Sequence, residues 1–238
     1  MYQQLRNLIT TPIFLFQMGK VGSSSLNSTL NANYHGLTVH AHNYQMLTEK
    51  QKAILRWRKR LRLPIYVICP IREPLSRNIS AFFENFNRDT GLKFADKKEW
   101  PSDELLDLFL THYPHNVCLE WFDSNLKTTF GVDVFSQPFP IARKWEIYKH
   151  KSIHVLIYRS DIEHSTQLNI ISSFIGYHFS EWTYNNISAD KKYGEIYKKF
   201  VGSVKLPDSY ISKMCDSKFC RKFWSEEEIE MIKDRFKG

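Results

Sequence analysis

The chain has 238 residues, of which 42% are hydrophobic and 15% aromatic, so it can bury a large core and is not a disordered chain. Its 33 Lys and Arg against 25 Asp and Glu give a net charge of +8, which favours polyanionic ligands such as nucleic acid, phosphorylated cofactors or acidic glycans without choosing among them. No apolar run approaches the roughly 20 residues of a membrane helix, so we expect no transmembrane segment.

Residues 11–30, TPIFLFQMGKVGSSSLNSTL, predict a strand, a tight loop and a helix. Such a loop directs backbone N–H groups and the partial positive charge of a helix N-terminus at one point, which favours a phosphate or sulfate. An ordinary helix cap has a similar composition, so the loop by itself leaves both interpretations open. The residues that would hold the anion are Lys20, Val21, Gly22, Ser23, Ser24 and Ser25.

The same loop has a spacing that separates two families of anion loops. A nucleotide triphosphatase loop needs Gly-x-x-x-x-Gly-Lys followed by Ser or Thr. Here Phe14 occupies the first glycine position and Val21 follows Lys20, which excludes that loop. Residues 17–26, QMGKVGSSSL, instead resemble the 5′-phosphosulfate loop of sulfotransferases that use 3′-phosphoadenosine 5′-phosphosulfate (PAPS). The resemblance implies that Lys20 stabilises the leaving phosphate of this cofactor.

The next β-like run, residues 36–42, ends in two histidines separated by one residue. Alternate residues of a strand share a face, so His40 and His42 should point the same way. Two histidines so placed could ligate a metal or act as a general base with a partner. The other histidines form no second ligand cluster in the sequence, which favours the base over the metal.

A second resemblance concerns this histidine pair. His40-Ala41-His42, followed by Asn43 and Tyr44, resembles the His-x-His of the heparan and uronyl 2-O-sulfotransferases. In that family the pair follows the phosphosulfate loop and its helix and supplies the base that deprotonates a sugar hydroxyl. The resemblance implies that His42 is the base and that His40 supports it.

A strongly basic helix is predicted over residues 48–61, where Thr48 and Gln51 form a capping box. A charge run of this kind is usually a solvated face, although a surface for an acidic substrate stays open. We expect an apolar side formed by Ile54, Leu55, Trp57 and Leu61, and a solvent side formed by Lys50, Lys52, Arg56, Arg58, Lys59, Arg60 and Arg62.

Residues 64–70, PIYVICP, predict a buried parallel strand that leads directly into IREPLSRNISAFF. Arg72 stands just beyond the strand, Pro74 suits the first turn of a helix, and Ser80 follows two turns later. An arginine fork and a hydroxyl can together hold a phosphate dianion. In the resemblance, Arg72 and Ser80 match the arginine and serine of the sulfotransferase 3′-phosphate loop. Two anion loops after two strands suit a cofactor with separated phosphate groups at the carboxyl edge of a parallel sheet.

The rest of the chain carries weaker functional signals. Residues 87–100 are polar and predict a loop, and residues 101–113 predict a core helix. The aromatic residues of 118–131 are expected in the core, with a sugar-stacking surface as the alternative. The WFD segment and the following GVDVF also resemble bacterial sulfotransferases associated with capsular polysaccharide synthesis. Further on, we predict a strand pair at 141–148 and 153–158 and helices at 161–175 and 225–236.

A late basic segment contains Lys191 and Lys192. By position it resembles the loop that closes over the nucleotide in the sulfotransferase family, which would make both lysines cofactor contacts. The four cysteines form no CxxC pair, so free thiols in a reducing cytoplasm are the simplest expectation.

Together these features predict a single α/β domain over residues 1–238, with a three-layer, P-loop-like sulfotransferase fold around a mainly parallel sheet. The expected activity is sulfuryl transfer from PAPS, without a metal, to a hydroxyl of a polysaccharide or other glycan, possibly an acidic one, leaving 3′-phosphoadenosine 5′-phosphate (PAP). Two alternatives stay open, a nucleotide-dependent kinase that prefers ATP with Mg²⁺ and a basic nucleic-acid-binding module. Neither of them requires both anion loops at these spacings.

Overall fold

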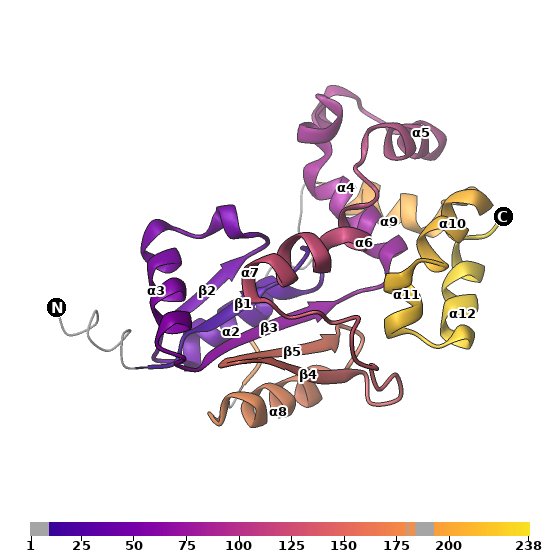
Figure 1. The fold of residues 1–238 in the computed structure, drawn as a ribbon. Coiled ribbons are helices and arrows are strands. Elements are labelled where there is room, and N and C mark those ends of the chain that lie inside the picture. Colours follow the sequence, from indigo (N-terminus) through magenta and orange to yellow (C-terminus); the bar gives the residue numbers. More distant parts are fainter. Residues whose placement is uncertain (1–9, 180, 184–192) are drawn as a thin grey trace. The chain divides into compact units, whose positions relative to one another are not determined.

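The computed structural model describes residues 10–179, 181–183 and 193–238 (Figure 1). The chain divides into two compact units, unit 1 with residues 1–72 and 120–185 and unit 2 with residues 73–119 and 186–238. Unit 1 contains the sheet, and unit 2 is helical in its described part. The prediction of one domain over residues 1–238 stays a prediction.

Unit 1 is built on a five-stranded sheet with the order β2-β1-β3-β5-β4. All neighbouring strands are parallel except β4, which is antiparallel to β5. The predicted α/β class with a mainly parallel sheet is thereby confirmed, and the finer sulfotransferase fold stays a prediction. The strands are β1 (Ile13–Phe16), β2 (Thr38–Ala41), β3 (Ile65–Ile71), β4 (Trp145–His150) and β5 (Ile153–Arg159); the helical segments are α2 (Ser23–Asn33), η1 (Tyr44–Met46), α3 (Glu49–Arg60), η3 (Phe122–Lys127), α7 (Thr128–Phe130) and α8 (His164–Ile175).

Both faces of β1 are buried, and its alternating side chains pack against different helices. Ile13 and Leu15 belong to a core cluster with residues of α2, β3, β5 and α8. Phe14 and Phe16 face the other way, and both rings meet Phe130 edge-on, with ring centroids 5.6 and 5.1 Å apart. The sheet of unit 1 is therefore a middle layer, with α2 and α8 on one side and α7 on the other (Figure 1).

The strand order places a topological switch point at the end of β1. The chain leaves β1 to form β2 on one side of it and then returns to form β3 on the other side. Because these strands are parallel, their carboxyl ends lie at one edge, and in open α/β sheets ligands bind in the crevice outside that edge. The segments that leave this edge at β1 and its two neighbours are the loop after β1, the residues after β2, and Arg72 after β3.

Helix α3 corrects the predicted division between its apolar and solvent sides. Arg58 is only 3% exposed, whereas Trp57 and Leu61 are 42% and 51% exposed. Arg58 follows Ile54 by four residues and therefore lies on the same buried face of the helix. The backbone carbonyl groups of Pro64 and Thr10 accept hydrogen bonds from its guanidinium, at 3.0 and 3.3 Å. The Thr10 carbonyl is 48 residues away in sequence, so burial of this charge depends on a tertiary contact.

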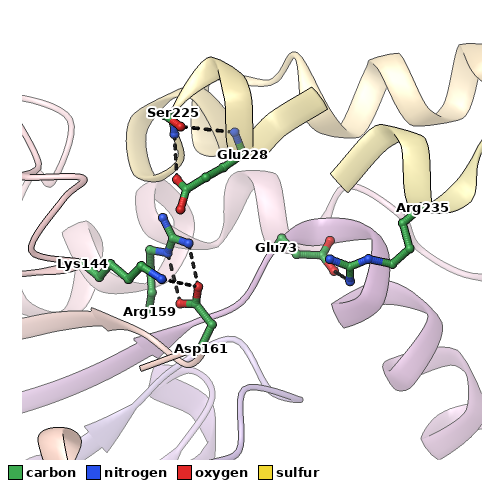
Figure 2. A network of polar contacts seen from close by, with 7 residues as sticks. All are labelled: Glu73, Lys144, Arg159, Asp161, Ser225, Glu228 and Arg235. Carbon is green, nitrogen blue, oxygen red and sulfur yellow. Dashed lines mark hydrogen bonds and ion pairs between the residues drawn. The ribbon is translucent and has the colours of Figure 1, made fainter. Parts of the chain in front are cut away.

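The second strand pair and the following helix are confirmed with shifted starts. Residues 141–144 form a turn, so β4 begins at Trp145. Helix α8 begins at His164 and not at Asp161. The Asp161 carboxylate, which precedes the helix, forms ion pairs with Arg159 at 2.6 Å and Lys144 at 3.1 Å (Figure 2). Burial by itself would raise the pKa of Asp161, but these two partners hold that pKa below its usual value.

Unit 2 packs its helices around an aromatic core centred on α4. The ring of Phe82 lies 5.4 Å from that of Phe109, and Phe83 lies 5.3 Å from Phe200. Helix α4 continues to Thr90, so the loop predicted from residue 87 begins later. The predicted core helix at 101–113 is confirmed, whereas three helices after residue 193 were not predicted. The elements are α4 (Pro74–Thr90), η2 (Phe94–Asp96), α5 (Ser102–His112), α6 (Val117–Trp121, which runs on into unit 1), α9 (Gly194–Ser203), α10 (Asp208–Cys215), α11 (Lys218–Phe223) and α12 (Glu226–Phe236).

Side chains cap the helices where the sequence indicates. Thr48 and Gln51 cap α3 reciprocally, and Ser225 and Glu228 cap α12 in the same way (Figure 2). Glu73 caps α4 by accepting hydrogen bonds from the backbone N–H groups of Leu75 and Ser76, and it also forms an ion pair with Arg235 at 3.8 Å (Figure 2). Both predicted capping boxes are thus confirmed.

Within the described part of the chain, no helix has the length and apolar character needed to cross a bilayer.

The aromatic residues predicted for the core at 118–131 are buried, since Trp121, Phe122 and Phe130 are each at most 3% exposed. The prediction of core packing is confirmed for these three side chains, which leaves them unable to form a sugar-stacking surface.

Candidate active site at the carboxyl edge of the sheet

The loop between β1 and α2 has an unusual backbone. Gly19, Lys20 and Gly22 have φ values of 82°, 62° and 79°, which are all in the left-handed region. A Cβ atom makes this region unfavourable, so glycine is the ordinary residue there and Lys20 is held in it at a cost. The space around Gly22 is open, so its requirement for glycine comes from its φ value and not from crowding. Backbone strain of this kind is concentrated at functional sites.

This backbone turns directly into helix α2. Gly22 is the N-cap of the helix and has no side chain with which to cap it, and Ser23, Ser24 and Ser25 form the first turn. The backbone N–H groups of a first turn point out of the helix end, where the helix dipole favours an anion. The six residues predicted to hold an anion therefore form one continuous turn at the switch point of the sheet.

The structure joins this loop to both histidines through Gln17, a residue that the sequence analysis did not select. Gln17 is completely buried. Its Nε2 atom lies 2.8 Å from Ser23 Oγ, 3.1 Å from His40 Nε2 and 3.0 Å from His42 Nδ1. Its Oε1 atom accepts a hydrogen bond from the backbone N–H of Gly19. The signal in the sequence is a polar residue placed between a strand and a glycine loop. The sequence does not reveal the histidine partners of Gln17, because they are 23 and 25 residues away.

The two imidazole rings meet as the alternation of β2 predicts. The ring centroids of His40 and His42 are 5.3 Å apart, with the rings nearly perpendicular. His40 lies in β2, and His42 follows directly after the strand ends. The indole Nε1 of buried Trp121 donates a hydrogen bond to the His42 carbonyl oxygen at 2.7 Å, which holds the backbone in place. The predicted shared orientation of His40 and His42 is confirmed, since both rings contact Gln17 Nε2.

His40 is held in its neutral form. Burial, followed by the neighbouring His42, lowers the pKa of His40 from 6.5 to about 4. Both causes disfavour the imidazolium, because a charged ring loses hydration when buried and is repelled by a second positive ring. A ring with this pKa binds a proton poorly near neutrality, which makes His40 the weaker candidate for a general base.

The depressed pKa of His40 predicts a pH dependence of folding. The unfolded chain binds a proton at this ring near pH 6.5, and the folded chain does so only near pH 4. The stability contributed by neutral His40 is therefore complete above about pH 6.5 and is lost as the pH falls toward about 4. We expect urea unfolding midpoints to fall less between about pH 7 and pH 5 in His40→Gln than in the wild type. Equal falls would contradict this role, and the exposed His35 provides the control variant His35→Gln.

Arg72 reaches the anion loop from the end of β3. Its Nη1 atom lies 3.5 Å from the backbone oxygen of Lys20, which is a weak contact but brings the two segments together. Ser80 is 5% exposed and lies in α4, which belongs to unit 2. Its pairing with Arg72 stays a prediction. Lys191 and Lys192 lie outside the described residues.

The metal alternative has no support in the part of the chain that the structure describes. Among those residues, no group of three or more His, Cys, Asp or Glu side chains is placed to hold a metal ion. The rings of His40 and His42 both contact the Gln17 amide and each other, and His40 also contacts Ser23. All four cysteines are buried free thiols.

Comparisons with known proteins do not identify a family. No family model, no curated protein and no solved structure matches the chain. The arrangement of the residues themselves is therefore the basis for a function.

Proposed function

We propose that the chain is a sulfotransferase that moves the sulfuryl group of PAPS to a hydroxyl of a glycan. The observation that carries the proposal is the Gln17 contact set, through which one buried side chain joins a strained, lysine-bearing anion loop to a histidine pair. Sulfuryl transfer needs such a pairing, because a donor anion must be held beside a base that deprotonates the acceptor.

The donor set of the loop fits a phosphosulfate. The backbone N–H groups of a helix first turn and the hydroxyl groups of Ser23, Ser24 and Ser25 are neutral donors to anionic oxygens. Lys20 adds a full positive charge where the leaving phosphate would develop its own charge. Arg72 lies next to this loop in unit 1, and we assign it to the 3′-phosphate, while Ser80, Lys191 and Lys192 stay predicted contacts.

The chemical step is an in-line displacement. His42 takes the proton of the acceptor hydroxyl, the acceptor oxygen forms a bond to sulfur, and the sulfur–oxygen bond to the phosphate breaks, which releases PAP. Positioning and charge stabilisation dominate such transfers, by analogy with phosphoryl transfer. His40 stays neutral beside the base, so it adds no positive charge that would repel the proton accepted by His42.

We assign an acidic glycan as the acceptor and a reducing cytoplasm as the location. The net charge of +8 suits an acidic glycan, in line with the resemblance to 2-O-sulfotransferases. A reducing cytoplasm is supported by four buried cysteines that are all free thiols. Nucleic-acid binding would use the same charge but would not need the Gln17 contacts to two histidines.

Thermal unfolding with added nucleotides tests the proposal. A ligand at 100 times its dissociation constant adds about 2.7 kcal/mol of stability, which corresponds to a midpoint shift of about 5–11 °C for this chain length. We expect this shift with PAP and not with ATP-Mg²⁺. No shift with PAP, or a shift with ATP-Mg²⁺ alone, would overturn the proposal and favour a kinase.

A further inference from the structure

The amide of Gln17 has more neighbours than it has hydrogens. Its orientation is set by the backbone N–H of Gly19, which donates to Oε1 and so identifies the other atom as the NH₂ nitrogen. That nitrogen carries two hydrogens but lies within 3.1 Å of three polar atoms, on Ser23, His40 and His42. One of these three contacts must therefore lack a hydrogen.

His42 Nδ1 faces a conflict of the same kind. It lies 3.0 Å from the Gln17 backbone oxygen, which can only accept, and 3.0 Å from Gln17 Nε2, which can only donate. A protonated Nδ1 bonds to the backbone oxygen, and an unprotonated Nδ1 bonds to the amide. The two hydrogen bonds exclude each other.

One proton arrangement gives every polar atom of Gln17 a hydrogen-bond partner. If His42 Nδ1 donates to the Gln17 backbone oxygen, the amide can give its two hydrogens to Ser23 Oγ and to an unprotonated His40 Nε2. The Ser23 hydroxyl, which rotates, can turn its own hydrogen toward His40 Nε2, 3.2 Å away. Only the contact between Gln17 Nε2 and His42 Nδ1 then joins two donors.

The opposite arrangement also has one repulsive contact, but it has one hydrogen bond fewer. If the amide donates to His42 Nδ1 and Ser23, the lone pair of that nitrogen and the backbone oxygen face each other at 3.0 Å. The Ser23 hydroxyl can again turn its hydrogen toward an unprotonated His40 Nε2. A buried carbonyl group would lose its donor as well, which is unfavourable.

We infer that Gln17 and its backbone carbonyl are a positioning device that holds both imidazole rings in the tautomer with hydrogen on Nδ1, so that His42 presents an unprotonated Nε2 as the base. The inference rests on the proposed function only for the role of His42 as a base. When His42 Nε2 accepts the proton of the hydroxyl, its Nδ1–H keeps the bond to the carbonyl oxygen, so the imidazolium forms without rearrangement. Gln17 itself touches no reacting atom in this scheme.

Histidine tautomers are read directly by NMR of the free protein labelled with ¹⁵N-histidine, near pH 8. We expect both rings to show a protonated Nδ1 and an unprotonated Nε2, the minority tautomer of free histidine. Missing signals in His40→Asn and His42→Asn assign the two rings. A protonated Nε2 on His42 would overturn the inference. This reading needs neither PAPS nor acceptor, so its failure is distinct from a failure of the nucleotide melts.

Gln17→Met tests the role of the Gln17 side chain separately from that of its backbone carbonyl. In Gln17→Met the amide is lost and the carbonyl stays, so we expect His40 to change to the tautomer with hydrogen on Nε2, while His42 keeps its own. Gln167→Met is the matched control, because Gln167 is also buried in unit 1 but bonds to the Ile162 oxygen, and both rings should stay unchanged in it. An unchanged His40 in Gln17→Met would contradict the amide bond. If that variant does not fold, the wild-type spectrum still decides the tautomer of His42.

Discussion

Replacement of His42 by alanine should lower the rate of sulfuryl transfer by about 10²–10⁴-fold, the usual contribution of a general base. The affinity for PAP should stay within a few-fold of wild type, because the phosphates contact the loop and not the ring in the proposed site. The rate is measured from PAPS to whichever hydroxyl acceptor of a glycan panel the wild type sulfates, and PAP affinity by calorimetry.

The matched control for this prediction is His40→Ala. His40 is the neutral partner, so its loss should reduce the rate less than the loss of His42. A larger effect in His40→Ala would reverse the roles of the two rings. Equal loss of PAP affinity in His42→Ala would show that His42 maintains the loop and is not purely catalytic.

Replacement of Lys20 by glycine should weaken PAP binding without weakening the fold. Loss of a charge-assisted contact, worth about 1.5–3 kcal/mol, lowers affinity roughly 10- to 100-fold. Because Lys20 has a φ of 62°, glycine relieves about 1–2 kcal/mol of backbone strain. Glycine also stabilises the unfolded chain by about 0.4–1 kcal/mol. The free energy of unfolding should therefore stay the same or rise by up to about 1.6 kcal/mol, as measured by urea unfolding.

Lys151 provides a matched control for this second prediction. It is an exposed lysine of unit 1 with a φ of 55°, in the turn between β4 and β5. Lys151→Gly should change stability in the same direction but leave PAP affinity unchanged. Equal loss of PAP affinity in both variants would indicate that net charge matters and not the position of Lys20. Unchanged affinity in Lys20→Gly would contradict the assignment of the loop.

Local features of the chain were predictable because their causes are local. Glycines at positions 19 and 22 between an apolar run and a helical pattern indicate the strand, loop and helix that the structure has at 13–33. Thr48 with Gln51, and Ser225 with Glu228, satisfy backbone groups only three residues away, so both capping boxes could be read directly. The apolar run before Arg72 likewise predicted β3.

Helix α3 shows where local reasoning failed. The helical period places Arg58 on the face of Ile54, but its charge argued for solvent, and the charge argument was wrong. Burial became favourable only because two carbonyl groups, one of them 48 residues away in sequence, meet the guanidinium. The three helices α9, α10 and α11 were missed because they are short and their stability comes mainly from packing in unit 2.

In the candidate site, too, the features with local causes were predictable and those with tertiary causes were not. By itself, the sequence determined the residue types, the anion loop and the shared orientation of His40 and His42, because strand alternation and glycine conformations are properties of a few neighbouring residues. Only the tertiary structure decided that β1 and β2 are neighbours, that Gln17 joins the loop to both rings, and that burial keeps His40 neutral. Those outcomes depend on contacts across more than twenty residues, and the free energy of burying a polar group is set by the partners that folding brings to it.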